Sequence, residues 1–200
     1  MSSNRRFPTL ALVVLIIGAV AIASVAILFL FSPAFNPSTN AVSIDQAKQS
    51  ADNYIAGTSS DLKVAEIEEY SNNFYARVQE RSTGINAFEL LVDHATGRVT
   101  REPGPDMMWN TKYGMMGGFG RTPTANMPVS AQKAAEYAQA WLDANMPGAK
   151  VEDPETFYGY YTIDVSRNGA TIGMLSVNGY SGEVWYHTWH GQFIAEMEYD

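Results

Sequence analysis

The pattern of hydrophobic and polar residues separates one long apolar run from a series of short amphipathic segments. Residues 9–31 contain no charged side chain. As a helix, these 23 residues would reach about 35 Å, which is enough to cross a hydrocarbon core of about 30 Å. Arg5 and Arg6 precede the run, and the next basic residue is Lys48. This asymmetry predicts a transmembrane helix with residues 1–8 in the cytoplasm and the rest of the chain outside.

A cleaved signal peptide is the alternative interpretation of this segment, because two arginines are typical of the basic start of such peptides. The apolar run is longer than the roughly 7–15 residues usual there, and residues 32–36 lack a small-x-small cleavage pattern. The sequence therefore favours an uncleaved anchor. Pro33 and Pro37 predict the end of the helix, and residues 32–41 form a polar linker.

The rest of the chain contains an internal repeat. At a shift of 87 residues, Val42-Ser43 falls on Val129-Ser130, and the match continues through the following helix and strand. After a two-residue gap the shift becomes 85, and Gly97 meets Gly182. The gap falls where a hairpin turn can absorb it. We therefore predict two copies of one domain, over residues 42–102 and 128–186, followed by arms over residues 103–127 and 187–200.

Each copy begins with an amphipathic helix and continues as alternating strands. Ser43 is a natural N-cap and Gln46 completes a capping box, whereas Ser130 caps the second helix without that partner. Apolar residues follow both caps at helical spacing. Asn168-Gly169, between two alternating stretches, predicts a tight hairpin. The predicted fold class is α+β: a helix packed on one face of a three- or four-stranded antiparallel sheet, used twice.

A short signature closes each copy: Val, then Asp or Asn, two residues, Thr or Ser, Gly, one residue and Val. It occupies residues 92–99 in the first copy and residues 177–184 in the second. With the capped helix and the paired strands, this signature resembles the PepSY domain. Members of this family are protease propeptides or membrane-anchored extracytoplasmic proteins. The resemblance therefore implies that this chain binds or restrains a peptidase or another partner and has no catalytic residues. The glycines of the signature are expected to be structural, because glycine allows a positive φ where the turn closes.

Composition excludes several kinds of function. The chain has no cysteine, which rules out disulfides, thiolate metal sites and cysteine nucleophiles. Beyond residue 31 it carries 11 basic and 21 acidic side chains, a balance that repels phosphate backbones and argues against nucleic-acid binding. The sequence has no nucleophile elbow, His-Glu-x-x-His motif or Walker glycine loop. These observations favour a protein that is not an enzyme.

The two arms hold clusters of methionine, histidine and aromatic residues. Four of the nine methionines lie within a ten-residue stretch of the first arm, and two of the three histidines lie in the second arm: Met107, Met108, Met115, Met116, His187 and His190. The aromatic residues of interest are Trp109, Tyr113, Trp189 and Phe193.

Three interpretations of the arms stay open. The residues could pack against a sheet or between the copies, the aromatic set could contact a protein partner, or the methionines and histidines could bind copper. Positions three apart on a strand point to opposite faces, which weakens the metal interpretation for His187 and His190. His94 falls in a predicted turn, where we expect it to be solvated.

The leading hypothesis is a membrane-anchored, extracytoplasmic module that binds a peptidase or another envelope protein and uses no cofactor. A copper-binding protein is one alternative. An accessory subunit of a membrane complex is another, since Gly18, Ala19 and Ser24 offer small-residue surfaces for helix packing.

Overall fold

The computed structural model describes residues 41–115 and 126–199. None of the helices in this part of the chain is both long and apolar enough to cross a bilayer. The predicted anchor over residues 9–31 and Met116 lie outside the described residues. The described chain is α+β with antiparallel sheets, which confirms the predicted fold class at that level.

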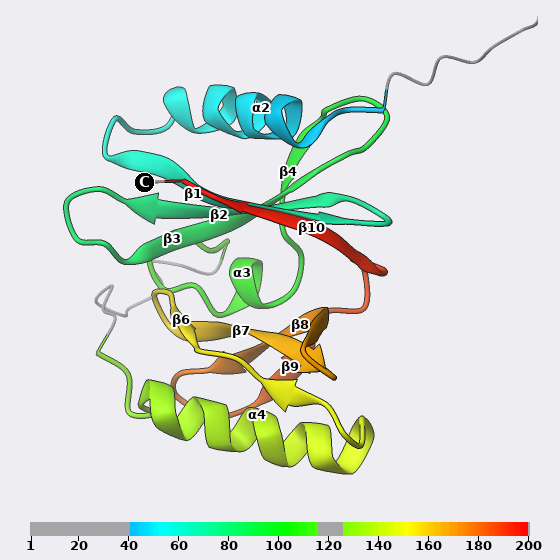
Figure 1. Cartoon of the computed structure of the whole chain (residues 1–200). Helices are drawn as coiled ribbons and strands as arrows, with labels where there is room; N and C mark the ends of the chain where they lie inside the picture. Colours follow the sequence, from blue (N-terminus) through cyan, green and yellow to red (C-terminus); the bar gives the residue numbers. More distant parts are fainter. Residues whose placement is uncertain (1–40, 116–125, 200) are drawn as a thin grey trace, which may run out of the picture. The chain divides into compact units, whose positions relative to one another are not determined.

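The first copy forms a helix and four antiparallel strands (Figure 1). They are α2 (Ile44–Ala56), β1 (Leu62–Tyr70), β2 (Phe74–Glu80), β3 (Asn86–Val92) and β4 (Val99–Arg101). A short helix follows, α3 (Pro105–Met108). Ser43 accepts a hydrogen bond from the backbone N–H of Gln46, and the Gln46 side chain accepts one from the backbone of Ser43. The predicted capping box is therefore present at the start of α2.

The second copy repeats this order. It contains α4 (Ala131–Asn145), β5 (Lys150–Val151), β6 (Glu155–Thr156), β7 (Tyr160–Arg167), β8 (Ala170–Asn178) and β9 (Val184–Tyr186). The short strands β5 and β6 both pair with β7, as β1 pairs with β2 in the first copy. Pro154 lies between the two short strands and cannot donate a ladder hydrogen bond.

The closing signature makes the same turn in both copies. Asp93 accepts hydrogen bonds from the backbone of Ala95 and Thr96, and Asn178 accepts the corresponding pair from residues 180 and 181. Gly97 and Gly182 have φ angles of 66° and 73°. The signature glycines therefore have the structural role that was predicted for them.

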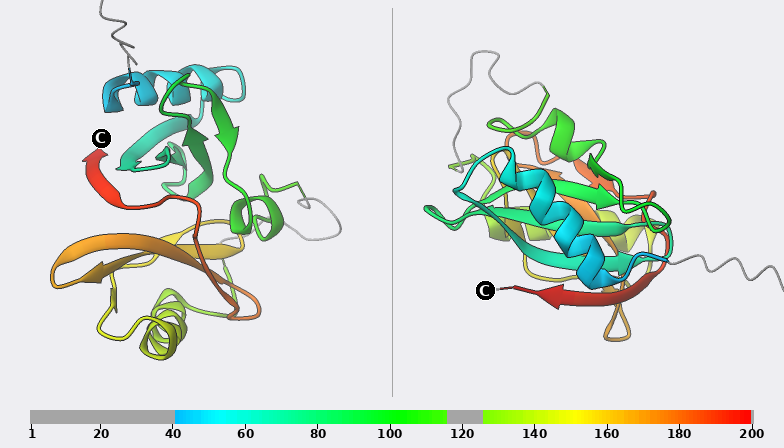
Figure 2. Two further views of the ribbon diagram at one scale, coloured as in Figure 1. Left: turned by 90° about the vertical axis from the view of Figure 1, so that its right-hand side faces the viewer. Right: turned by 90° about the horizontal axis from the view of Figure 1, so that it is seen from above.

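The number of strands differs from the prediction. In the described chain each sheet has five strands rather than three or four. The first sheet gains β10 (Phe193–Glu198), which comes from the C-terminal arm and pairs antiparallel with β1 (Figure 2). The repeat could not reveal β10, because this strand follows the second copy but completes the sheet of the first.

Each helix packs on one face of its own sheet. Ala47, Ala51 and Ile55 of α2 join the buried apolar residues of β1, β2 and β3, and Leu142 of α4 does the same with β7 and β8. The other faces of the two sheets meet each other, so that within residues 41–199 the layers run helix, sheet, sheet, helix (Figure 1). Strand β2 is therefore buried almost continuously.

Candidate functional site

The contact between the two sheets, called the seam from here on, is polar. Side chains alternate along a strand, so the residues between the core positions all point away from the helices. On the first sheet they are Glu66, Glu68, Tyr70, Tyr75, Arg77 and Glu89, and on the second they are Tyr160, Thr162, Asp164, Met174 and Ser176. Carboxylates are almost never buried without partners, so the seam is the part of the described chain where a function is to be sought.

Glu89 lies at the centre of the seam, fully buried. Its carboxylate accepts hydrogen bonds from the hydroxyls of Tyr75 at 2.9 Å, Tyr160 at 2.8 Å and Thr162 at 2.7 Å. Burial, followed by the nearby charges of Glu102 and Asp106, raises the pKa of Glu89. Two of the three donors come from β7, so this carboxylate joins the two copies.

A second connection between the copies runs through Arg77. Its guanidinium pairs with Glu66 of the neighbouring strand at 2.7 Å and with Glu155 of the second copy at 3.0 Å. Asn86 accepts from the same guanidinium and donates to Glu155. The charges of Glu66 and Glu155 raise the pKa of Arg77 despite its burial.

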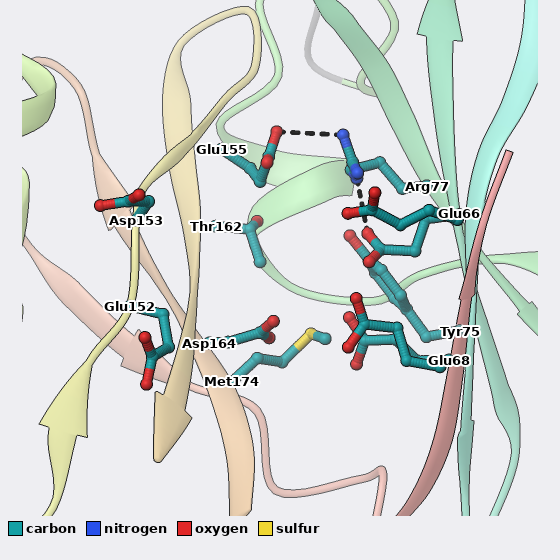
Figure 3. Close-up of a pocket in the computed structure, with 12 residues that line it drawn as sticks. Glu66, Glu68, Tyr75, Arg77, Glu152, Asp153, Glu155, Thr162, Asp164 and Met174 are labelled. Atoms are coloured by element: carbon teal, nitrogen blue, oxygen red, sulfur yellow. Dashed lines mark hydrogen bonds and ion pairs between the residues drawn. The ribbon is translucent and has the colours of Figure 1, made fainter. Parts of the chain in front are cut away.

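Beside these contacts the seam opens into a cleft of about 220 Å³ (Figure 3). The residues that line it come from both copies and from β10: Glu66, Glu68, Tyr75, Arg77, Glu152, Asp153, Glu155, Thr162, Asp164, Met174, Glu196 and Glu198. Eight of these twelve are carboxylates and one is basic. Figure 3 shows Asp164 and Glu68 pointing toward one another across the opening.

Burial and mutual repulsion favour the protonated form of several carboxyl groups in this cleft. Burial, and then the charges of Glu66 and Glu196, raise the pKa of Asp164 to about 7. Burial also raises the pKa values of Glu66 and Glu68. A carboxylate in this condition gains from any cation that enters, because the cation offsets both the repulsion and the lost hydration.

The four aromatic residues predicted as a partner surface pack within the protein. Trp109 meets Trp185 edge to face, and Phe193 meets Tyr70 in the same way. Tyr113 contacts the rings of Phe88 and Tyr158 and donates to Glu80 at 2.5 Å. The indole of Trp189 donates to Glu102 at 2.9 Å. Their placement matches the packing interpretation of the arms.

The residues predicted to bind metal are divided by the fold. Met108 and Met115 are 56% and 71% exposed, and Met107 is partly buried. His187 and His190 are buried and both approach Glu102. The expectation that they point to opposite faces is wrong, because the segment from His187 to Gln192 is not a strand.

His94 also differs from its expected solvated position. Its ring stacks on Phe74 with centroids 4.3 Å apart, and Nε2 lies 2.7 Å from the backbone oxygen of Tyr70. The turn that carries His94 therefore folds back over the start of β2.

Sequence reasoning missed the carboxylates of the cleft. The available signal was their period of two: Glu66 and Glu68 alternate with core residues on β1, as Thr162 and Asp164 do on β7. This pattern is normally that of a solvated sheet face. Only the second sheet turns that face into a cleft.

Comparisons with known proteins add little to this geometry. No family model matches the chain, and no curated protein matches it. Among solved structures, the C-terminal domain of YpeB from Bacillus megaterium is similar, with 12% identity and a TM-score of 0.27. The match covers 72% of this chain and 62% of that chain, so this chain spans less than two thirds of its length. A likeness of this size carries no argument about function.

Proposed function

We propose that this chain is a membrane-anchored, extracytoplasmic binding module with two PepSY-like domains, and that its acidic cleft takes a cationic group of a protein partner. The observation that supports this most directly is the cleft itself, where eight carboxylates face one arginine. The signature turns of both copies support the PepSY-like assignment. A peptidase is the partner class that this resemblance implies.

The chemistry of the cleft favours a lysine or arginine side chain of the partner. Glu152, Asp153, Glu196 and Glu198 are exposed and lie on the rim, so they attract a cation before it is desolvated. Asp164 and Glu68 lie deeper and gain more from the cation once it has entered, since attraction is stronger where water is excluded.

The module acts by occupancy rather than by chemistry. The most buried carboxylate of the seam, Glu89, already accepts from two tyrosines and a threonine. Arg77 is held by Glu66 and Glu155. These groups are engaged in holding the two copies together and are not poised to transfer a proton to a substrate.

The experiment is a quantitative pull-down from detergent-solubilised membranes with the full chain as bait. A variant with Glu152→Gln, Asp153→Asn, Glu196→Gln and Glu198→Gln keeps side-chain size and removes the rim charges. We expect it to lose at least about tenfold in captured partner relative to the unaltered chain, since each rim charge steers and holds a cation. Partner identity is read by mass spectrometry, and envelope proteolysis is followed in the same strains.

A control for surface charge removes three exposed carboxylates, Glu136, Asp143 and Glu183, which lie on α4 and before β9, away from the cleft. Glu136→Gln, Asp143→Asn and Glu183→Gln together should leave capture unchanged. Equal losses in both variants would mean a nonspecific charge effect. Equal capture by the cleft variant and the unaltered chain would reject the proposal.

Metal binding is a second candidate function, favoured by the meeting of His187 and His190 at Glu102. If the metal is copper bound by thioether sulfurs, the variant with Met107, Met108, Met115 and Met116→Ser should lose Cu(I) binding. Unchanged copper content in that variant would show that the methionines do not bind the metal.

A further inference from the structure

Glu102 stands where the two copies and both arms come together. It follows β4 of the first copy, and its side chain is fully buried. His187 and His190 follow β9 of the second copy, on the segment that leads to β10. Gly104 lets the chain turn directly after this point, since its φ is 79° and a Cβ there would lie 3.3 Å from the Trp189 ring.

Two imidazoles and one carboxylate converge here. Oε1 of Glu102 lies 2.9 Å from Nε2 of His190 and 3.4 Å from Nδ1 of His187. One potential ligand atom from each residue lies within 4.8 Å of the other two. The three side chains are at most 1% exposed, so bulk solvent does not reach their polar atoms.

The far nitrogen of each ring is held by a polar group. Nε2 of His187 lies 2.9 Å from the hydroxyl of Ser176, and Nδ1 of His190 lies 2.9 Å from the side-chain oxygen of Asn73. The amide oxygen of Asn73 can only accept, so Nδ1 of His190 carries a proton and Nε2 is the ring nitrogen that faces Glu102. Such outer hydrogen bonds are what orients metal-ligating histidines.

Ring stacking fixes the same orientation. The Trp189 ring stacks on His187 and the Tyr70 ring stacks on His190, each with centroids 4.6 Å apart. Neither imidazole can turn away from Glu102 without giving up a stacked ring and a hydrogen bond. The cluster is therefore built in advance rather than assembled from mobile side chains.

The inner atoms have few partners. Nδ1 of His187 and Nε2 of His190 face only the Glu102 carboxylate, and Oε2 of Glu102 is buried without a hydrogen-bond partner. The indole of Trp189 donates to Oε1 only. A buried polar atom without a partner destabilises the fold, so the unpartnered Oε2 beside two inward-facing ring nitrogens indicates a missing ligand.

We propose that Glu102, His187 and His190 bind a divalent metal ion of the kind that prefers nitrogen and oxygen ligands, with Zn²⁺ as the best fit. Two ligands about 2.1 Å from a tetrahedral ion lie about 3.4 Å apart, close to the separations found here. The site differs from the predicted copper site because a carboxylate takes the place of the methionines. Bound metal would tie β4 of the first copy to the segment after β9 of the second.

The competing arrangement is an ion pair without metal. Glu102 would then be an ionised carboxylate paired with the two imidazoles, whose nearness lowers the pKa of this carboxyl despite its burial. That arrangement leaves Oε2 of Glu102 without a donor, which a metal ion would correct. The two arrangements differ in whether the protein binds zinc at all.

The test is a zinc titration of the full chain, purified in detergent and freed of metal with a chelator. Calorimetry should give one tight site, and X-ray absorption should show two imidazole nitrogens and a carboxylate oxygen at about 2.0–2.2 Å. His187→Gln or His190→Gln should weaken binding at least 100-fold. Asn73→Ala removes the outer hydrogen bond of His190 and the one that Asn73 donates to the backbone oxygen of Trp189, and it should weaken binding about tenfold.

Two controls separate this site from other parts of the chain. His94→Gln removes the remaining histidine and should keep zinc affinity within twofold. Glu196→Gln with Glu198→Gln breaks a second three-residue group among the described residues, the carboxylates of Glu66, Glu196 and Glu198, and should also keep zinc affinity within twofold. The X-ray spectrum of the unaltered chain gives an answer even if a histidine variant fails to fold. No zinc binding at about 100 μM, or a spectrum without imidazole, would overturn the proposal.

Discussion

The two faces of each sheet carry different chemistry on the same strands. Toward the helices, β2 presents Phe74, Ala76 and Val78 to an apolar core, and toward the seam it presents Tyr75 and Arg77. Both faces are buried, but only the helix-covered face is apolar. The seam buries carboxylates, and apolar residues in their place could give equal or better stability. Under the proposed function, such a face is retained for the cationic group that it binds.

The largest expected effect comes from breaking the apolar face. Leu142 is fully buried between α4 and its sheet, so Leu142→Ala should lower the free energy of unfolding by about 3 kcal/mol. Met174 is similar in size but lines the cleft, where water can fill the space that it leaves. Met174→Ala should therefore destabilise by less than half as much. Urea unfolding of both variants tests this, and equal losses would contradict the distinction between the faces.

The seam should make stability depend on pH in an unusual direction. Burial raises the pKa values of Asp164 and Asp106 to about 7, so the folded state holds protons that the unfolded state releases above about pH 4. Stability is then greatest below about pH 4 and falls as the pH rises from there through 7. We expect a loss of about 2 kcal/mol between pH 5 and pH 8. His190 acts in the opposite sense, because burial lowers its pKa, but it is one group against several.

Asp164→Asn sharpens this prediction, because it removes the charge and keeps the shape. The variant should be more stable than the unaltered chain at pH 8 and should lose part of the pH dependence. Thermal unfolding at pH 5, 6.5 and 8 measures both effects. Stability that rises steadily from pH 5 to pH 8 in the unaltered chain would contradict the raised pKa values of the buried carboxyl groups.

The smallest expected effect compares the two helix starts. Ser43 has a full capping box, whereas Ser130 accepts from Lys133 without the reciprocal bond. Ser43→Ala should destabilise by about 1 kcal/mol and Ser130→Ala by slightly less. In a chain that already carries Gln46→Ala, the loss of stability from Ser43→Ala should fall to the loss from Ser130→Ala. Chemical denaturation of these variants measures the losses, and a larger loss at Ser130 than at Ser43 would contradict the prediction.

The helix-covered faces were predictable from the sequence, and the seam was not. Caps, helical spacing and the repeated turn signature are local patterns, so they determined α2, α4 and the turns at Asp93 and Asn178. The cleft depends on contacts such as Tyr160 with Glu89, which are 71 residues apart. Strand β10 completes a sheet that begins more than a hundred residues earlier. Pairings of this kind leave no mark in a local pattern.

The partner contact itself is the most direct test of the account. A photo-crosslinking residue is placed at Asp153 on the cleft rim in one variant and at Asp143 on α4 in another, and each full chain is irradiated in native membranes. Both positions are exposed. We predict a discrete protein adduct from position 153 that excess lysine-rich peptide suppresses, and none from position 143. An adduct from position 143 alone, or equal adducts that the peptide does not affect, would contradict the assignment of the cleft as the binding site.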